Sequence, residues 1–430
     1  MSNVVALHGS ATPDSAWPEQ LQRNQHGAPL ATLANAIAVM MYHPQLVGAV
    51  GFDTYKQVKT KRKKLPFPCE LGAWRDTDSI ELRAWFSKNQ AMNLSAEVVN
   101  SAVEAVSRRN TYDSLKEQIE GHKWDGVFRL ENVAEVYFGA GPDKLSNLFC
   151  KRFLIQAIAR ALDPGCKADC MLVFEGAQGK RKSTALQTLF GGRVNYSENR
   201  ISFSDKDGMQ SIASIWCQEI AELDALKRSE VTEIKAFLSK REDRYRPAYG
   251  REVIEIPRRC VFTGTTNDDV WNDDTTGGRR FWPVKICNDI RLDLIERDRE
   301  LLWAEARERY RSGEKYWFDE DELDAADARE AQAARTNEHP WAEIIESYAS
   351  NLSTFDRESG LSAVEILTNA IGIEREKITK RDTMHLPAIM RSIGWVRDKQ
   401  QSVRKGARVR LYRPETLQAP PLTPQPEDDY

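Results

Sequence analysis

Residues 171–184 read MLVFEGAQGKRKST, and the rest of the chain can be organised around them. The apolar run 171–174 is typical of a buried strand, two glycines interrupt a short loop, and an apolar helical pattern begins at Lys182. Strand, glycine-containing loop, Lys-Ser pair and helix are the layout of a phosphate-binding loop. Its backbone N–H groups face an anion, its lysine reaches the β- and γ-phosphates, and its serine hydroxyl is a ligand for Mg2+. The stretch therefore predicts a site for ATP and Mg2+ made by Gly176, Ala177, Gln178, Gly179, Lys180, Arg181, Lys182, Ser183 and Thr184.

One position departs from the usual pattern, which has a glycine directly before the lysine. This chain has Arg181 there. A backbone with positive φ at this position would cost an arginine roughly 1–2 kcal/mol. With negative φ, the arginine would instead add positive charge beside the phosphates. The sequence leaves both possibilities open.

Length and composition limit the remaining choices. A chain of 430 residues has room for two or three domains, and a net charge of −3 identifies no partner. Seven scattered cysteines, with no secretory signal pattern at the start, favour a reduced, cytoplasmic protein. No run of about 18 apolar residues is present, so we expect no membrane contact.

Residues 1–120 are predicted to form a mainly helical domain, which could serve in oligomerisation or DNA contact, with helices at 31–42, 76–86 and 95–107. Asp76 and Asp78 precede a helix and are interpreted as capping residues. The segment lacks clustered carboxylates on strands, so it does not support primase chemistry. A basic run at 56–64 is interpreted either as a solvated loop or as a DNA contact.

The acids that ATP hydrolysis requires follow the loop in sequence. Residues 215–224 read IWCQEIAELD, an apolar strand whose end is acidic. One carboxylate is needed near Mg2+, and another orients the attacking water. We assign Ser183, Glu219 and Glu222 to the metal site and Glu222 to the water. Without a phosphate loop before them, Glu219, Glu222 and Asp224 would be interpreted as acids at a helix start.

Further polar groups follow. Asn267 ends a β-branched strand and can position water or a phosphate oxygen. Arg279 and Arg280 precede another apolar strand, and arginine suits the neutralisation of a transferring phosphoryl group. Residues 240–251 interleave basic and aromatic side chains at a predicted hairpin, which favours DNA binding through Arg244, Arg246, Tyr249 and Arg251.

The pattern of predicted elements changes after residue 335. Three helices, at 341–348, 362–369 and 383–393, precede two short strands, at 395–397 and 408–412. This order resembles a winged-helix domain over 336–413. Its basic hairpin predicts DNA contacts from Arg404, Lys405 and Arg408. Residues 414–430 are rich in proline and acid and predict a disordered tail.

These motifs, in this order, resemble the virulence-associated protein E family of phages and mobile elements over about residues 120–320. They are GAQGKRKST, EIAELD, YRPAYG, GTTN and GRRFWPV. That family is similar to superfamily 3 helicases. The resemblance implies an α/β fold with an AAA+-like P-loop ATPase core at 121–335, flanked by the helical and winged-helix-like domains, in a homo-oligomer that is usually a hexameric ring. It also implies that Lys182 and Ser183 hold phosphate and Mg2+, that Glu222 and Asn267 serve hydrolysis, and that Arg280, or Arg279, reaches the next subunit.

The expected function is an ATP-dependent DNA helicase for the replication of a phage or mobile element, working with a separate primase or polymerase. One alternative is a DNA-binding initiator or regulator that uses ATP only to assemble, its hydrolysis blunted by Arg181. Another is a protein-remodelling AAA+ ATPase, against which the basic hairpin argues.

Overall fold

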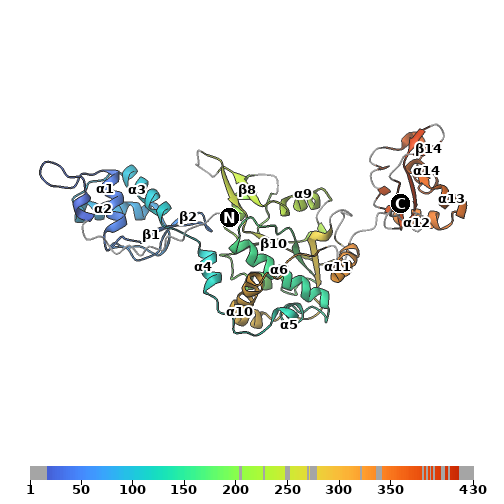
Figure 1. Ribbon diagram of the computed structural model, residues 1–430, viewed down its shortest axis with the longest axis horizontal. Helices are drawn as coiled ribbons and strands as arrows, with labels where there is room; N and C mark the ends of the chain where they lie inside the picture. The colour runs from blue at the N-terminus through green and yellow to red at the C-terminus, as the bar shows by residue number, and fades with distance from the viewer. Residues whose placement is uncertain are drawn as a thin grey trace, which may run out of the picture.

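The computed structural model describes residues 17–415 apart from several short stretches. These are 203–205, 226–227, 247–251, 269–270, 272–277, 320–321, 336–340, 380–381, 384–385, 388, 391–392, 399–401 and 405–406. Three bodies follow one another along the chain, and the largest lies in the middle (Figure 1). Each body has a hydrophobic core of its own.

The N-terminal body combines helices with a small sheet. Its helices are α1 (Leu33–Tyr42), α2 (Asp76–Gln90) and α3 (Ala96–Arg109). Four strands, β1 (Val50–Asp53), β2 (Val58–Lys61), β3 (Gly72–Ala73) and β4 (Thr111–Tyr112), form a sheet in the order β3-β2-β1-β4. The expected helices at 31–42, 76–86 and 95–107 coincide closely with α1, α2 and α3, so most of the regular structure of this body is helical. The four-stranded sheet is an addition, because strands of two to four residues are too short to give an alternating pattern and β1 pairs with β4 from far along the chain.

The basic segment 56–64 is largely occupied by contacts within the protein. The contacts are ion pairs Lys59–Glu104, Lys61–Asp78 and Arg62–Glu117, and hydrogen bonds from Lys56 to the carbonyl of Ser214 and from Lys63 to that of Val47. Lys61 and Asp78 are both buried, and Asp78 also accepts from the backbone N–H of Arg75 at the start of α2. Structural pairing thus accounts for most of these charges.

The central body is built on a parallel sheet of five strands. They are β5 (Met171–Glu175), β6 (Tyr196–Ser197), β7 (Cys217–Ile220), β10 (Val261–Thr266) and β11 (Phe281–Lys285), in the order β11-β5-β10-β7-β6. Every pairing is parallel, so the carboxyl ends of all five strands lie at one edge. The strands are buried on both faces, which explains their nearly continuous apolar sequences.

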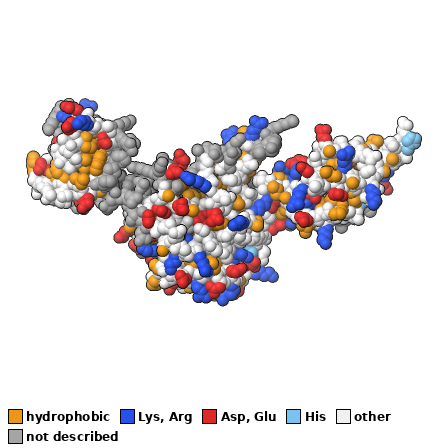
Figure 2. All heavy atoms as spheres, turned by 180° about the vertical axis from the view of Figure 1, so that it is seen from behind, with side chains coloured by type: hydrophobic (Ala, Val, Ile, Leu, Met, Phe, Trp, Pro, Cys, Tyr) orange, Lys and Arg blue, Asp and Glu red, His pale blue; other side chains and the backbone are white. Residues whose placement is uncertain are grey.

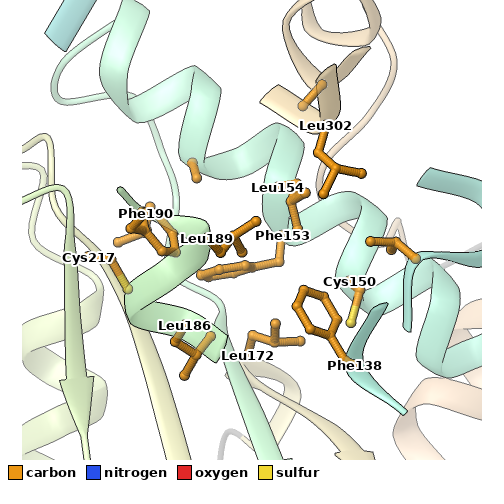
Figure 3. Packing of buried hydrophobic residues seen from close by; sticks show 14 of the residues in the cluster. Phe138, Cys150, Phe153, Leu154, Leu172, Leu186, Leu189, Phe190, Cys217 and Leu302 are labelled. Atoms are coloured by element: carbon orange, nitrogen blue, oxygen red, sulfur yellow. The ribbon is translucent and has the colours of Figure 1, made fainter. Parts of the chain in front are cut away.

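Helices cover both faces of this sheet. Alternate residues of β5 enter different cores: Leu172 and Phe174 pack on one side, Met171 and Val173 on the other. On the first side lie α6 (Lys144–Leu162), α7 (Lys182–Leu189) and α10 (Leu292–Arg311), whose apolar side chains interlock around Phe153 (Figure 3). Shorter helices, α4 (Ser114–Gly121) and α5 (Val133–Phe138), add to that core, and α9 (Arg228–Leu238) packs on the second side with α8 (Lys206–Ile212).

A two-stranded hairpin projects from the central body between α9 and β10 (Figure 1). Its strands are β8 (Glu242–Tyr245) and β9 (Ile254–Pro257). At its base, Asp243 and Arg258 form a fully buried ion pair, and Tyr245 is also buried. The base is therefore fixed to the body. Helix α11 (Leu323–Ala333) packs beside β11 and leads toward the C-terminal body.

The C-terminal body contains α12 (Trp341–Ser350), α13 (Thr354–Ser359) and α14 (Ala363–Asn369). Its sheet has the order β12-β16-β13, from Leu361–Ser362, Leu411–Pro414 and Trp395–Arg397. A separate hairpin joins β14 (Ser402–Arg404) to β15 (Ala407–Val409). The expectation of one hairpin from two strands is thus wrong, because β13 pairs with β16 and the basic segment between them folds on itself. The predicted helix at 383–393 is described only in part, and the tail from 416 lies outside the described residues.

Within the described part of the chain, no helix combines the length and apolar character needed to span a bilayer.

Candidate nucleotide-binding site

The phosphate-loop motif lies at the carboxyl edge of the sheet, between β5 and α7. Gly176 has φ of +143°, and a Cβ there would approach the carbonyl oxygen of Ile286 to 2.9 Å. Gly179 has φ of +86°. Both positions therefore require glycine for the loop to turn from the strand into the helix.

Arg181 lies in the left-handed region, with φ 61° and ψ 30°, directly before α7. Of the two possibilities that the sequence leaves open, negative φ is wrong. A conformation that glycine adopts freely is held here by an arginine, at a cost of roughly 1–2 kcal/mol. The side chain is exposed at the rim of the loop.

Lys182 is buried and points back along the loop. Its ammonium donates hydrogen bonds to the carbonyls of Gly176 and Ala177 and, over 3.2 Å, to Oδ1 of Asn267. Asn267 is brought there because β10 pairs with β5 and Thr266 lies opposite Glu175. The lysine thus joins the loop to the end of the neighbouring strand.

Glu219 is the centre of a buried hydrogen-bond network. Its carboxylate accepts from Ser183 Oγ over 2.7 Å, from Thr265 Oγ1 over 2.6 Å and from the Tyr196 hydroxyl. Burial raises the pKa of Glu219, while hydrogen bonds from Thr265 and Ser183 and the charge of Lys182 lower it. A serine hydroxyl against a carboxylate is an all-oxygen donor set of the kind that Mg2+ prefers, so these two residues fit the ion.

Two more acids follow the end of β7. Glu222 is exposed, has φ of +55°, and its carboxylate makes no hydrogen bond or ion pair with the described residues. Asp224 accepts from Thr266 Oγ1 over 2.8 Å. Burial lowers the pKa of Lys182, and the charges of Asp224 and, to a smaller extent, Glu219 raise it. Asp224 thus acts on the lysine through its charge, a role that the sequence analysis did not give it although it lies in the same acidic run.

Arg279 and Arg280 lie at the opposite edge of the sheet. They end a short 3-10 helix, Gly278–Arg280, immediately before β11. Nε of Arg280 lies 3.7 Å from Asp169 Oδ2, just ahead of β5, and makes no hydrogen bond within the described residues. Five residues of β5 separate this edge from the loop, a distance of about 17 Å. Neither arginine is placed to reach the phosphate loop of its own chain.

A further buried group supports the loop from behind. Glu175, the last residue of β5, is fully buried and accepts hydrogen bonds from the Arg335 guanidinium and from Trp271 Nε1. Arg335 follows α11, so this ion pair connects the start of the phosphate loop with the segment that leads to the C-terminal body. The sequence carries no signal for a contact between residues 160 positions apart.

The predicted DNA-binding residues are only partly described. Arg244 and Arg246 are exposed on the β8–β9 hairpin, where basic side chains line the projection (Figure 2). Arg244 lies 3.3 Å from Glu255 in an exposed ion pair. Arg408 is exposed on β15. Tyr249, Arg251 and Lys405 lie outside the described residues, as does the side chain of Arg404.

The comparison with protein families covers the part of the chain that holds these groups. The model of the virulence-associated protein E-like domain matches residues 119–337, about half of the chain. The chain therefore belongs to the virulence-associated protein E-like family. The match begins at α4 and ends just after Arg335, so it contains the whole parallel sheet and the hairpin.

Two solved structures of the NrS-1 C-terminal region, both apo forms, are similar to this chain at low identity. One is 14% identical with a TM-score of 0.37 and covers 84% of this chain and 95% of its own. The other, described as the A form, is 13% identical with a TM-score of 0.39 and covers 85% and 95%. No curated protein matches the chain.

Proposed function

We propose that the chain is an ATP-hydrolysing DNA motor of the AAA+-like, superfamily 3-like class, serving the replication of a phage or mobile element. The observation that carries this proposal is the convergence of Lys182, Ser183, Glu219 and Asn267 at one edge of the parallel sheet. In parallel α/β sheets, ligands bind outside the carboxyl ends of the strands. Family membership supports the same class of protein.

In this proposal the loop 176–184 holds the phosphates of ATP, and Lys182 exchanges its carbonyl contacts for phosphate oxygens. Ser183 and Glu219 hold Mg2+, which supplies charge neutralisation at the phosphates when bound. Glu222 orients the attacking water, and Asn267 positions it against the phosphate. Asp224 holds Thr266 and balances the charge of Lys182.

The position of the arginines supports an assembly of several copies. Arg279 and Arg280 lie about 17 Å from their own phosphate loop, so they act only on the nucleotide of a neighbouring subunit. A closed ring, hexameric by family resemblance, places each arginine edge against the next carboxyl edge. The β8–β9 hairpin then carries Arg244 and Arg246 to DNA, and Arg408 adds a contact from the C-terminal body.

The test measures ATP hydrolysis with and without single-stranded DNA, together with unwinding of a forked duplex. We expect Mg2+-dependent hydrolysis that DNA stimulates, unwinding that requires ATP, and loss of both in Lys182→Ala. A rate of ATP hydrolysis that DNA leaves unchanged, together with no unwinding, would contradict the proposal.

A second candidate is a DNA-binding initiator that uses ATP to assemble and hydrolyses it slowly. The observation that favours it is the left-handed Arg181, which places a bulky, strained residue beside the phosphates. Single-turnover measurements separate the two candidates: the initiator binds ATP tightly and retains it through many DNA-binding events, whereas the motor turns it over.

A further inference from the structure

The amino edge of the central sheet carries a groove that the functions above do not use. It has a volume of about 710 Å³ and lies at the base of the β8–β9 hairpin. Its walls come from the loop between α6 and β5, from α8, and from the segment that joins α9 to β8. Three cations, Lys240, Arg241 and Arg244, line it together with a single acid, Glu242.

The groove is held open by well-defined contacts. Gly165 has φ of +83°, and a Cβ there would lie 3.2 Å from the carbonyl oxygen of Arg241. Arg241 Nε donates to the carbonyl of Gly165 over 2.7 Å, and the N–H of Gly165 donates to the carbonyl of Arg258 over 2.9 Å. The two walls are therefore tied together at the bottom of the groove.

A buried cation lies beneath this floor. Arg160, on α6, is 1% exposed and donates to the carbonyls of Arg258, Ala168 and Lys240 over 3.0–3.3 Å. Its Nε has no hydrogen-bond partner, and no carboxylate among the described residues pairs with it. The one buried acid nearby, Asp243, is already paired with Arg258. The floor therefore carries a buried positive charge that backbone carbonyls solvate and that has no carboxylate of the described residues bonded to it. In a low-dielectric interior such a charge acts over a longer range than in water.

The surface cations add to this potential. Arg241 is exposed, and Lys240 is half-buried with its ammonium 5.0 Å from the centre of the Phe237 ring. The ion pair of Arg244 with Glu255 is largely exposed on both sides. An exposed pair contributes little to stability, so a phosphate can replace Glu255 at small cost.

We infer that this groove binds the phosphodiester backbone of single-stranded DNA, as a second contact behind the hairpin on the sheet edge opposite to the nucleotide site. The inference rests on the proposed function and adds to it the path of the strand: from the exposed arginines of the hairpin, along β8, to Lys240 and Arg241 at its base. Two adjacent cations over a buried guanidinium grip successive phosphates without reading bases, as a moving contact requires.

The experiment measures binding of a fluorescent oligothymidylate to the full-length chain as a function of salt. The variant Lys240→Gln/Arg241→Gln removes both surface charges. We expect its affinity to fall roughly tenfold and the slope of log affinity against log salt to become shallower by about 1.4. The charge-conserving Lys240→Arg/Arg241→Lys keeps the parent slope. Lys116→Gln, which removes an exposed cation on α4, leaves both quantities unchanged.

The outcomes separate this inference from the proposed function. An oligonucleotide that does not bind the parent chain overturns both. If parent and variant bind with the same affinity and the same salt slope, the inference about the groove is overturned and the proposed function is not. Thermal unfolding of the variant, matched to the charge-conserving pair, shows whether lost binding reflects lost charge or a loosened fold. Inorganic phosphate, added at equal ionic strength, is the last measurement. If it lowers the affinity of the parent to that of the variant, it competes with the oligonucleotide at the groove, as the inference requires; if it binds the parent without displacing the oligonucleotide, the groove is a site for free phosphate and the inference fails.

Discussion

The two edges of the central sheet differ in how their charged groups are satisfied. At the carboxyl edge, Lys182, Ser183 and Glu219 hydrogen-bond to one another or to groups a few ångströms away. At the amino edge, Nε of both Arg160 and Arg280 lacks a partner within the described structure. At one edge the charged groups are joined in a hydrogen-bond network, and at the other a buried guanidinium, Arg160, and a partly exposed one, Arg280, each keep an Nε without a hydrogen bond to the described residues.

This difference makes the two edges of the sheet chemically distinct. A parallel sheet places all its carboxyl ends together, so the nucleotide groups have one location available to them. In the proposed function, the exposed cations at the other edge face a neighbouring copy and a DNA strand. If ATP is hydrolysed between subunits, the sheet itself is the rigid element that connects the two edges.

The largest expected effect comes from removing the contact that we propose between Arg280 of one copy and the phosphate loop of the next. Arg280→Ala should lower ATP hydrolysis by about 10³-fold, as should Lys182→Ala. A mixture of the two variants should recover activity, because a Lys182→Ala subunit still offers Arg280 to a neighbour with an intact loop. Steady-state hydrolysis by mixed oligomers, with their size checked by light scattering, measures this. Mixed oligomers that stay inactive would place Arg280 outside the active interface.

A second prediction separates the two acids beyond β7. Glu222→Gln should lower kcat by roughly 10²-fold with ATP affinity intact, because the group that orients water is lost. Asp224→Asn should cost roughly tenfold and weaken ATP binding, since its charge acts on Lys182 and its oxygen holds Thr266. Rapid-quench hydrolysis and nucleotide titrations measure the two quantities. If Asp224→Asn lowered kcat more than Glu222→Gln did, Asp224 would be the residue that orients the water.

A third prediction concerns the support behind the metal site. Tyr196→Phe removes a hydrogen bond to Glu219, and we expect the Mg2+ concentration for half-maximal hydrolysis to rise about tenfold. The rate at saturating Mg2+ should stay near that of the parent. Tyr55→Phe is the matched control, because this phenol is also buried but bonds to Asn195 and not to Glu219. An equal shift in both variants would indicate a general loss of packing.

Features that depend on the order of motifs along the chain can be predicted from the sequence. The phosphate loop, the acidic strand and Asn267 were each identified from a strand followed by a polar end, and parallel pairing then brings such ends together. The actual contact of Lys182 with Asn267 depends on β10 being the neighbour of β5. That neighbour relation is a property of the topology and has no local signature.

Other features could not be predicted because they depend on long-range packing or on one dihedral angle. The pair Glu175–Arg335 joins residues far apart, and either residue alone has the pattern of an ordinary surface charge. Arg160 falls within an amphipathic helix, where an arginine is expected to face solvent, yet carbonyls from three segments bury it. The choice between Glu222 and Asp224 depends on the turn after β7, in which Glu222 takes positive φ.

The smallest expected effect concerns Arg181, where strain and charge make opposite predictions. Arg181→Gly removes the left-handed penalty of roughly 1–2 kcal/mol but adds the entropic cost of glycine, roughly 0.5–1 kcal/mol. The free energy of unfolding should therefore rise by up to about 1.5 kcal/mol, and ATP hydrolysis should become faster. Arg181→Ala is the control, because it removes the charge and keeps the Cβ that causes the strain. A gain in Arg181→Gly alone assigns the effect to the backbone. Equal loss of ATP affinity in both variants would show instead that the guanidinium contacts phosphate. Arg181 would then bind the nucleotide directly at the carboxyl edge.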